Sequence, residues 1–244
     1  DKAPIKQSNL CCEINLPTKP LNSISDEEGE ISLCTLAAIN WGNIKKPEDF
    51  AKPCELAVRA LDELLDYQEY PVLAAEISTK NRRPLGIGII NFAYWLAKHG
   101  TTYTDPDLEL IDEWAEAWSY NLIKASADLA KEKECIPLNN ETKYGAGILP
   151  VDTYKRDVDD LVKRKLTCDW GKLKEQLKEH GIRNSTLMAL MPSETSSQIS
   201  NATNGIEPPR SYVSVKQSKD GILKQVVPEY RNLRSKYELL WDQT

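Results

Sequence analysis

The pattern of apolar and polar positions predicts a fold of mixed strands and helices. Residues 31–40 alternate apolar and small polar side chains, which is typical of a half-buried strand, and this strand would contain Cys34. Residues 82–92 are apolar and interrupted by glycines. Their G-x-G spacing lacks the third glycine of a nucleotide fingerprint, so we expect these glycines to allow close backbone packing. Residues 184–191 and 212–215 predict further strands.

Helical periodicity predicts the other elements. A helix that begins at Pro53 and ends by Tyr67 would bury one apolar face, made of Leu56, Ala60, Leu61, Leu64 and Leu65. A longer amphipathic helix would begin at the N-cap and first-turn pair Asp105–Pro106 and end near Lys133. Shorter helices are predicted over residues 93–97, 154–161, 169–180, 198–201 and 228–241.

Composition narrows the class of protein. The 244 residues suffice for a substantial core and for one or two domains. A formal net charge of -6 with scattered Lys and Arg leaves no basic stripe, so we predict no nucleic-acid partner. The apolar runs are too short to cross a membrane and no signal sequence opens the chain, so we expect a cytoplasmic protein without a membrane partner.

The cysteines and histidines have simple structural interpretations. The cysteines show none of the C-x-x-C pairs of zinc and dithiol sites, and they stand at positions 11, 12, 34, 54, 135 and 168. We predict that this chain holds no metal, and that Cys54, Cys135 and Cys168 act as small apolar residues. His99 and His180 each precede a glycine at a predicted helix end, so we expect them to cap helices.

The stretch from Ser8 to Ile14 carries the strongest chemical signal. It sets an amide, a thiol and a carboxylate at alternating positions, namely Asn9, Cys11 and Glu13. In an extended segment or at a loop tip these side chains can face one side and share one small site. A thiol, a general base and a neutral hydrogen-bond donor around one substrate form a chemical set that packing alone does not require.

A second informative stretch runs from Pro192 to Gln198 and follows the apolar segment 184–191. Free amides at a helix start, with Ser and Thr hydroxyls beside them, can bind phosphate without a lysine. The same residues also fit an ordinary capped helix of the [S/T]-x-x-[E/Q] type. The stretch alone leaves both interpretations open.

Four motifs, in this order and over nearly the whole chain, resemble the large catalytic subunit of an aerobic class I ribonucleotide reductase, closest to the enterobacterial and T-even-phage type. The motifs are Ser8-Asn9-Leu10-Cys11-x-Glu13, Leu33-Cys34-Thr35-Leu36, Arg83-x-Leu85-Gly86-Ile87-Gly88, and Pro192-Ser193-Glu194-Thr195-Ser196-Ser197-Gln198 with Asn204-Gly205-Ile206-Glu207-Pro208-Pro209. Each motif alone is weak, but together they are specific.

The resemblance implies an α/β fold that is part of a ten-stranded α/β barrel built from two half-barrels. A finger loop threaded through the barrel would carry the catalytic cysteine. Residues 1–244 would form one partial barrel domain. Within it, residues 1–30 would be the finger loop and following turn, and residues 31–244 the strands and surrounding helices of the second half-barrel.

The resemblance also implies a role for each motif residue. Cys11 would be the thiyl-radical site that takes the ribose 3′ hydrogen, Glu13 the base for the 3′ hydroxyl, and Asn9 a hydrogen-bond partner of the sugar. Cys34 would be one of two redox-active cysteines that reduce the 2′ position. The substrate, a ribonucleoside diphosphate, would be held by Ser8, Asn9, Pro192, Ser193, Glu194, Thr195 and Ser196.

The resemblance implies an incomplete subunit, because the partner of Cys34, the specificity-effector site and the ATP-binding region would lie upstream of residue 1, and the radical-transfer tyrosines and the cysteine-bearing tail would lie beyond Thr244. Cys12 stands where the family usually has a bulky apolar residue, and we assign it no role. We expect a catalytic-subunit piece whose missing part was removed experimentally or is encoded separately. It would bind no cofactor itself, and would work with a metal-containing, radical-generating small subunit and with thioredoxin or glutaredoxin. The complete large subunit would be a homodimer in the cytoplasm of a bacterium or a phage-infected bacterium.

Two other classes of protein stay open. A non-catalytic assembly fragment would keep the fold without the reaction, because other parts of the catalytic machinery lie outside this chain. A cysteine hydrolase would need His99 or His180 to activate Cys11.

Overall fold

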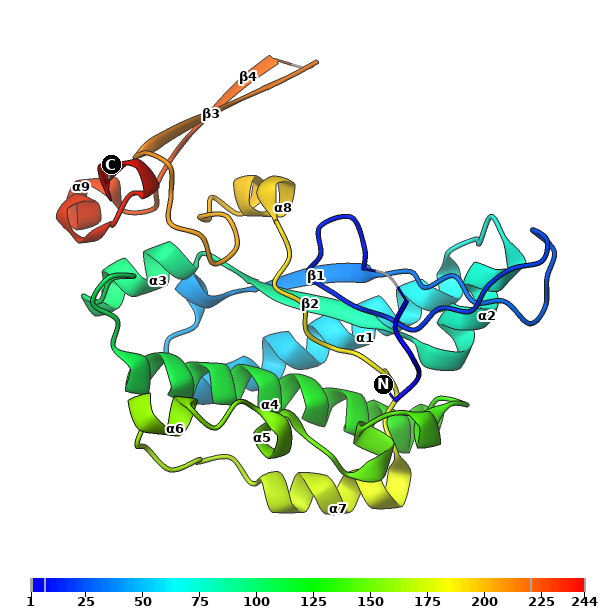
Figure 1. Cartoon of the computed structure of the whole chain (residues 1–244). Helices are drawn as coiled ribbons and strands as arrows, with labels where there is room; N and C mark the ends of the chain where they lie inside the picture. The colour runs from blue at the N-terminus through cyan, green and yellow to red at the C-terminus, as the bar shows by residue number, and fades with distance from the viewer. Residues whose placement is uncertain (1, 7, 220, 244) are drawn as a thin grey trace.

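The fold combines strands and helices, as expected for the α/β class, in a computed structural model that describes residues 2–6, 8–219 and 221–243 (Figure 1). Its strands are β1 (Thr35–Asn40), β2 (Leu85–Ile90), β3 (Val213–Ser218) and β4 (Gly221–Val226). Its α-helices are α1 (Ala51–Tyr67), α2 (Leu73–Arg82), α3 (Phe92–His99), α4 (Leu108–Lys133), α5 (Pro150–Thr153), α6 (Val158–Leu161), α7 (Trp170–His180), α8 (Glu194–Ile199) and α9 (Tyr230–Leu233). Its 3-10 helices are η1 (Trp41–Asn43), η2 (Pro47–Phe50), η3 (Asn139–Glu141), η4 (Tyr144–Ala146), η5 (Arg234–Lys236) and η6 (Leu240–Gln243).

A short parallel sheet lies at the centre of this arrangement. β1 and β2 run parallel, with Thr35 opposite Leu85. On the other edge of β2, Met188 forms an isolated parallel bridge with Ile87. The strand predicted over 184–191 is therefore reduced to this one bridge. β2 is therefore flanked on both edges and is buried along its whole length. The described residues form an open sheet rather than a closed barrel, as expected for part of a barrel.

Helices cover one face of the sheet and leave the hairpin free on the other side. α1 packs against α4 and against both strands, and α7 packs against α4. Figure 1 shows α1, α4 and α7 on the same side of the sheet, with α8 and the antiparallel β3–β4 hairpin on the opposite side. The hairpin extends away from the rest of the molecule.

An aromatic cluster joins the sheet to the helices. Trp41 directly follows β1 and is fully buried. Other aromatic rings surround it at centroid distances of 5.4 to 6.4 Å, mostly edge to face. These rings belong to Phe50, Phe92, Trp95, Trp114 and Trp118. Because aromatic side chains bury large apolar areas, this cluster packs η1 and η2, which follow β1, firmly against α3 and α4.

The helix predicted from Pro53 to Tyr67 is confirmed as α1, but its predicted buried face is partly wrong. Leu56 and Leu64 are exposed. The buried side chains of α1 are instead Cys54, Val58, Leu61, Asp62 and Leu65. Asp62 occupies a core position because it forms ion pairs with arginines, which the apolar pattern cannot reveal.

The first predicted strand is shorter than expected. It begins at Thr35, so Cys34 precedes β1 instead of lying inside it. The Ile31 amide donates to the carbonyl of Ala74 in α2, 3.1 Å away, and not to a neighbouring strand, so the strand cannot begin at residue 31.

The helix predicted over 228–241 is wrong, because the chain there forms only the short elements α9, η5 and η6. The hydroxyl of Tyr237 donates to the carbonyl of Pro228, so the chain folds back where a helix would continue. The stretch 154–161 likewise contains only the four-residue helix α6. The helix predicted over 169–180 is confirmed as α7.

The N-cap of α4 differs from the prediction. Asp107, and not Asp105, precedes the helix, and its carboxylate accepts a hydrogen bond from the Leu110 amide at 3.1 Å. The Asp105 carbonyl instead accepts a hydrogen bond from Thr101 in the preceding turn.

Candidate functional site

Residues 9–12 form a turn at the exposed tip of the N-terminal loop, which the family resemblance predicts to be a finger loop and which is called the finger loop below. The Cys12 amide donates to the Asn9 carbonyl at 3.1 Å, and Cys12 itself has a positive φ of 59°. Leu10 is 98% exposed, and Cys11 and Cys12 are exposed beside it. The Asn9 side-chain oxygen accepts from the Ile14 amide at 3.3 Å. The motif is therefore a loop tip and not an extended strand, and Asn9 closes its turn.

Glu13 and Cys34 lie within electrostatic range of each other. Burial raises the pKa of Cys34 to about 11, and the negative charge of Glu13 contributes to the rise. The Oε2 atom of Glu13 is buried and has no hydrogen-bond partner among the described residues. The next residues of the loop, Ile14 and Leu16, pack with Ala189 and Cys34. The loop thus returns across the start of β1.

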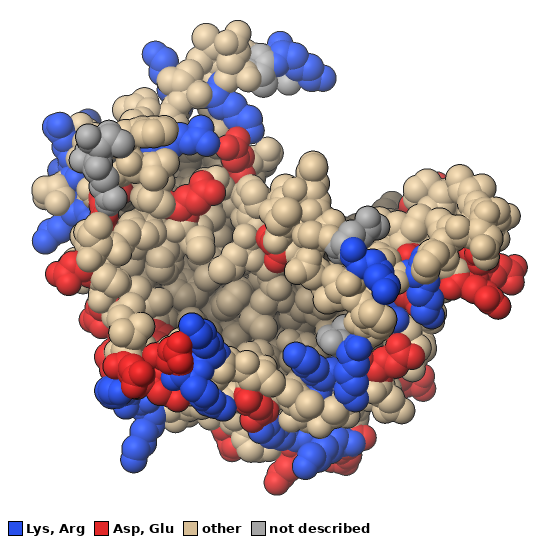
Figure 2. All heavy atoms as spheres, viewed as in Figure 1, with Lys and Arg blue, Asp and Glu red and all other residues tan. Residues whose placement is uncertain are grey.

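A cavity of about 480 Å³ lies between the finger loop and the start of β1. Ser8, Asn9 and Cys34 are among its lining residues, so the structure brings together three of the residues that the sequence singled out. Cys11 does not line it. Figure 2 shows the face of the molecule hollowed in the middle, with uncharged side chains in the hollow and Lys, Arg, Asp and Glu around the rim.

The turn before α8 does not form the expected helix cap. Ser193 is the N-cap residue and is buried, but its side chain makes no capping hydrogen bond. Its hydroxyl donates to the Asn204 side chain at 3.0 Å and accepts from the Gly205 amide at 2.9 Å. The capped-helix interpretation is therefore wrong for Ser193. The amides of the first turn of α8 have no intrahelical partner, and Glu194, Thr195 and Ser196 are exposed.

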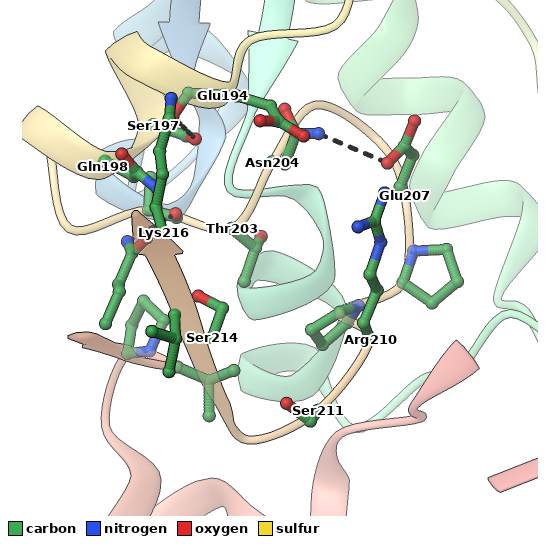
Figure 3. A pocket seen from close by; sticks show the side chains of 17 residues that line it. Glu194, Ser197, Gln198, Thr203, Asn204, Glu207, Arg210, Ser211, Ser214 and Lys216 are labelled. Carbon is green, nitrogen blue, oxygen red and sulfur yellow. Dashed lines mark hydrogen bonds between the residues drawn. The ribbon is translucent and has the colours of Figure 1, made fainter. Parts of the chain in front are cut away.

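The sequence did not reveal a second cavity, of about 190 Å³, beside α8. Its lining includes Glu194 from α8, Glu207 and Arg210 from the following loop, and Lys216 from β3. In Figure 3, Lys216 lies across the cavity from Glu207 and Arg210. The Nζ atom of Lys216 is 3.5 Å from the Thr195 hydroxyl, so a cation stands beside the predicted anion site. No short motif could show this, because three separate segments build the cavity.

The other predicted residues occupy structural positions. His99 and His180 are the last residues of α3 and α7, and His99 Nδ1 lies 2.8 Å from the Trp95 carbonyl oxygen. No hydrogen bond joins either histidine to Cys11 within the described ranges. Cys54 is fully buried as predicted, whereas Cys135 and Cys168 are partly buried.

The described residues show neither a metal site nor a membrane-spanning helix. Among the described residues, no group of three or more His, Cys, Asp or Glu side chains could hold a metal ion. None of the helices in the described ranges combines the length and the apolar character that crossing a membrane requires.

Comparison with known proteins shows the family of this chain. A family model described as "Ribonucleotide reductase, barrel domain" matches residues 1–240. The ribonucleoside-diphosphate reductase subunit alpha of Haemophilus influenzae is 61% identical over 98% of this chain. Subunit alpha of ribonucleoside-diphosphate reductase 1 of Escherichia coli K12 is also 61% identical over 98%, and that of phage T4 is 49% identical over 99%. In each case the chain covers 32% of the relative, or about a third of its length. The chain therefore belongs to the ribonucleotide reductase barrel-domain family.

Proposed function

We propose that this chain supplies part of the catalytic barrel of a class I ribonucleoside-diphosphate reductase. In the overall reaction a ribonucleoside diphosphate and two thiols give a 2′-deoxyribonucleoside diphosphate, a disulfide and water. The observation that carries the proposal is the finger loop. It lies against the start of β1, so that Asn9 and Cys34 line one cavity and the charge of Glu13 acts on Cys34.

The loop tip would start the reaction. As a thiyl radical, Cys11 takes the 3′ hydrogen atom of the ribose and returns it after reduction. Glu13 accepts the proton of the 3′ hydroxyl, a role that its buried and unpartnered oxygen supports. Because the side-chain oxygen of Asn9 already closes the turn, we expect its amide nitrogen to contact the sugar.

Cys34 would supply one of the two reducing thiols. Its raised pKa keeps it protonated at neutral pH, so it brings a proton as well as electrons to the 2′ carbon. The 2′ hydroxyl leaves as water, and the two thiols lose two electrons and two protons as they form the disulfide. The second thiol would come from a part of the subunit outside this chain.

The diphosphate would lie at the start of α8. Ser8 and the turn residues Pro192, Ser193, Glu194, Thr195 and Ser196 would hold the substrate. The uncapped amides of the first turn support this, because they can donate to phosphate oxygens. Lys216 adds a positive charge beside Thr195.

The proposal includes partners outside this chain. Residues 1–30 would be the finger loop and following turn, and residues 31–244 would join the remaining strands of the large subunit to close the barrel. The relatives are named as alpha subunits, which supports a radical-generating small subunit as a partner. Thioredoxin or glutaredoxin would reduce the disulfide, and the complete large subunit would be a homodimer in a bacterial cytoplasm.

Cys34→Ser tests the redox role in a reductase assembled from this chain, the remainder of the large subunit and the small subunit. We expect multiple turnovers with a dithiol reductant to stop. Cys168→Ser is the matched control, because Cys168 is also partly buried and its pKa is also raised to about 11, yet it lies away from the finger loop. Full multiple-turnover activity of Cys34→Ser would remove Cys34 from the redox pair.

Glu13→Gln separates the base from substrate binding in the same assembly. We expect turnover to fall at least a hundredfold, within the range that general-base catalysis contributes, while substrate affinity stays unchanged. Undiminished turnover would refute the assignment of Glu13 as the base.

A further inference from the structure

The limb of the finger loop that follows Cys11 is fixed at its end, where Lys19 pairs with Glu30. Lys19 and Glu30 form an antiparallel bridge, with backbone N–H to carbonyl distances of 3.1 and 3.2 Å. The Lys19 ammonium also lies 2.7 Å from the Glu30 carboxylate. The bridge closes residues 20–29 into a separate turn, and the loop that bears Cys11 comes directly before Lys19 in the chain.

Glu30 also binds a buried arginine of the scaffold. Nε of Arg82 donates to the Glu30 carboxylate at 2.7 Å, and both side chains are 2% exposed. Burial raises the pKa of Glu30, but the hydrogen bonds from Arg82 and Lys19 outweigh burial and hold that pKa below its usual value. Glu30 is therefore charged at neutral pH, and its charge is paired inside the protein.

Arg82 is itself held firmly. It is the last residue of α2, and its carbonyl accepts a hydrogen bond from the Ser185 amide at 2.9 Å, in the segment that follows on to Met188. Its guanidinium also approaches the Glu141 carboxylate at 3.5 Å. The backbone amide of Lys2, in the incoming limb, donates to the carbonyl of Glu141 at 2.7 Å. The limb after Cys11 therefore meets Arg82 directly through Glu30, and the limb before Cys11 is bonded to the backbone of Glu141, whose carboxylate faces the same arginine.

The tip of the loop has few contacts of this kind. Leu10, Cys11 and Cys12 are exposed, and the turn is closed mainly by hydrogen bonds within the loop. Because the tip has few contacts of its own, its position depends on where the base of the loop is held. We infer that Arg82 and Glu30 are positioning residues, which set where Cys11 stands against the substrate by clamping the base of the finger loop.

This inference deepens the proposed function and rests on it for the role of Cys11, but the clamp itself can be tested without activity. Arg83 supplies a matched control. It is adjacent in sequence, is similarly buried and is similarly paired, at 2.6 Å to Asp62 and 2.8 Å to Asp66. Both of its partners lie on α1 and not in the finger loop.

The first experiment is hydrogen exchange on this chain, comparing Arg82→Met with Arg83→Met. We expect the amides of Lys19, Glu30 and Ile31 to exchange at least tenfold faster in Arg82→Met than in Arg83→Met. Amides of β2 should exchange alike in the two variants. Glu30→Gln keeps the shape of the side chain and provides a second variant if Arg82→Met does not fold. Equal exchange at these three amides in the Arg82, Glu30 and Arg83 variants would overturn the clamp.

The second experiment measures deoxynucleotide formation by the assembled reductase. Since misplacement of a reacting group by about 1 Å can cost about a hundredfold, kcat should fall by up to that factor in Glu30→Gln. KM for the nucleotide should stay unchanged, because the proposed phosphate contacts lie at α8. Arg83→Met should keep kcat. A rise in KM with unchanged kcat would contradict a positioning role. The two experiments can also disagree. If the Arg82 variant exchanges faster but the assembly with the unaltered chain makes no product, the clamp is supported and the proposed function is refuted.

Discussion

Replacing Gly88 with Ala tests how closely the segment before α8 packs on β2. A Cβ at Gly88 would lie 2.5 Å from the Ala189 carbonyl oxygen and 2.5 Å from the Met191 sulfur. The Ala189 amide is bonded to the Ile87 carbonyl at 3.3 Å, so its backbone cannot move without loosening that contact. The added methyl group must therefore push residues 189–191 away from β2.

The cost follows from two opposing effects. Overpacking a dense core usually costs about 1–3 kcal/mol in the free energy of unfolding. Alanine is favoured over glycine inside a strand by about 0.5–1 kcal/mol. Subtracting the middle values of these ranges leaves a loss of about 1 kcal/mol, which for a chain of this size lowers the midpoint of thermal unfolding by about 2–4 °C.

Urea denaturation followed by tryptophan fluorescence measures the effect, with a lower midpoint and an unchanged slope expected. Gly171→Ala is the control, because the nearest atom to its Cβ would be an Asp169 oxygen at an ordinary 3.6 Å, and alanine should favour α7. The reasoning is refuted if Gly88→Ala is as stable as the unchanged chain while Gly171→Ala behaves as expected.

Three further substitutions probe the site and the core. Burial is the main cause of the raised pKa of Cys34 and the Glu13 charge adds to it, so Glu13→Gln should lower this pKa in part, and iodoacetamide should label Cys34 faster at about pH 9. An unchanged labelling rate would show that the Glu13 charge does not act on Cys34. Ser193→Ala leaves the Gly205 amide without its acceptor, although the Asn204 side-chain oxygen keeps the Ser193 amide as a donor, and should cost about 1–3 kcal/mol in urea unfolding. We also expect it to weaken nucleotide binding, and unaltered binding would argue against the α8 turn as the phosphate site. Trp41→Ala should cost about 3–5 kcal/mol, and a loss below about 1 kcal/mol would contradict its central place in the aromatic cluster.

Local patterns predicted those elements whose own residues decide their structure. The apolar, glycine-containing run at Leu85–Ile90 is a strand because both of its edges are covered, and its glycines do allow close packing, as the contacts at Gly86 and Gly88 show. The period of α1 and α7 is likewise local. Where tertiary hydrogen bonds intervene, the pattern failed. The Ile31 amide is taken by Ala74, and the Tyr237 hydroxyl ties back to Pro228, so neither the strand start nor the last helix follows the sequence period.

The candidate site likewise contains some features that the sequence predicts and others that it does not. The candidate residues Asn9, Cys11, Glu13 and Cys34 are predictions from short motifs and a family resemblance. Their mutual arrangement was not available from spacing, because the turn at the loop tip replaces the alternation of an extended segment. The pair Glu30 and Arg82 could not be found at all from the sequence, since its members are 52 positions apart and neither belongs to a motif.

The central claim is that Cys11 starts the reduction of a ribonucleoside diphosphate. The most direct measurement combines this chain, a polypeptide supplying the remainder of the large subunit, the small subunit, a dithiol reductant and labelled CDP, beside the same mixture carrying Cys11→Ser. We predict labelled deoxynucleotide with Cys11 and none with Cys11→Ser. Equal product in both mixtures would contradict the role of Cys11. No product in either, from a stable complex and with a competent control reductase, would leave this chain as a non-catalytic assembly fragment.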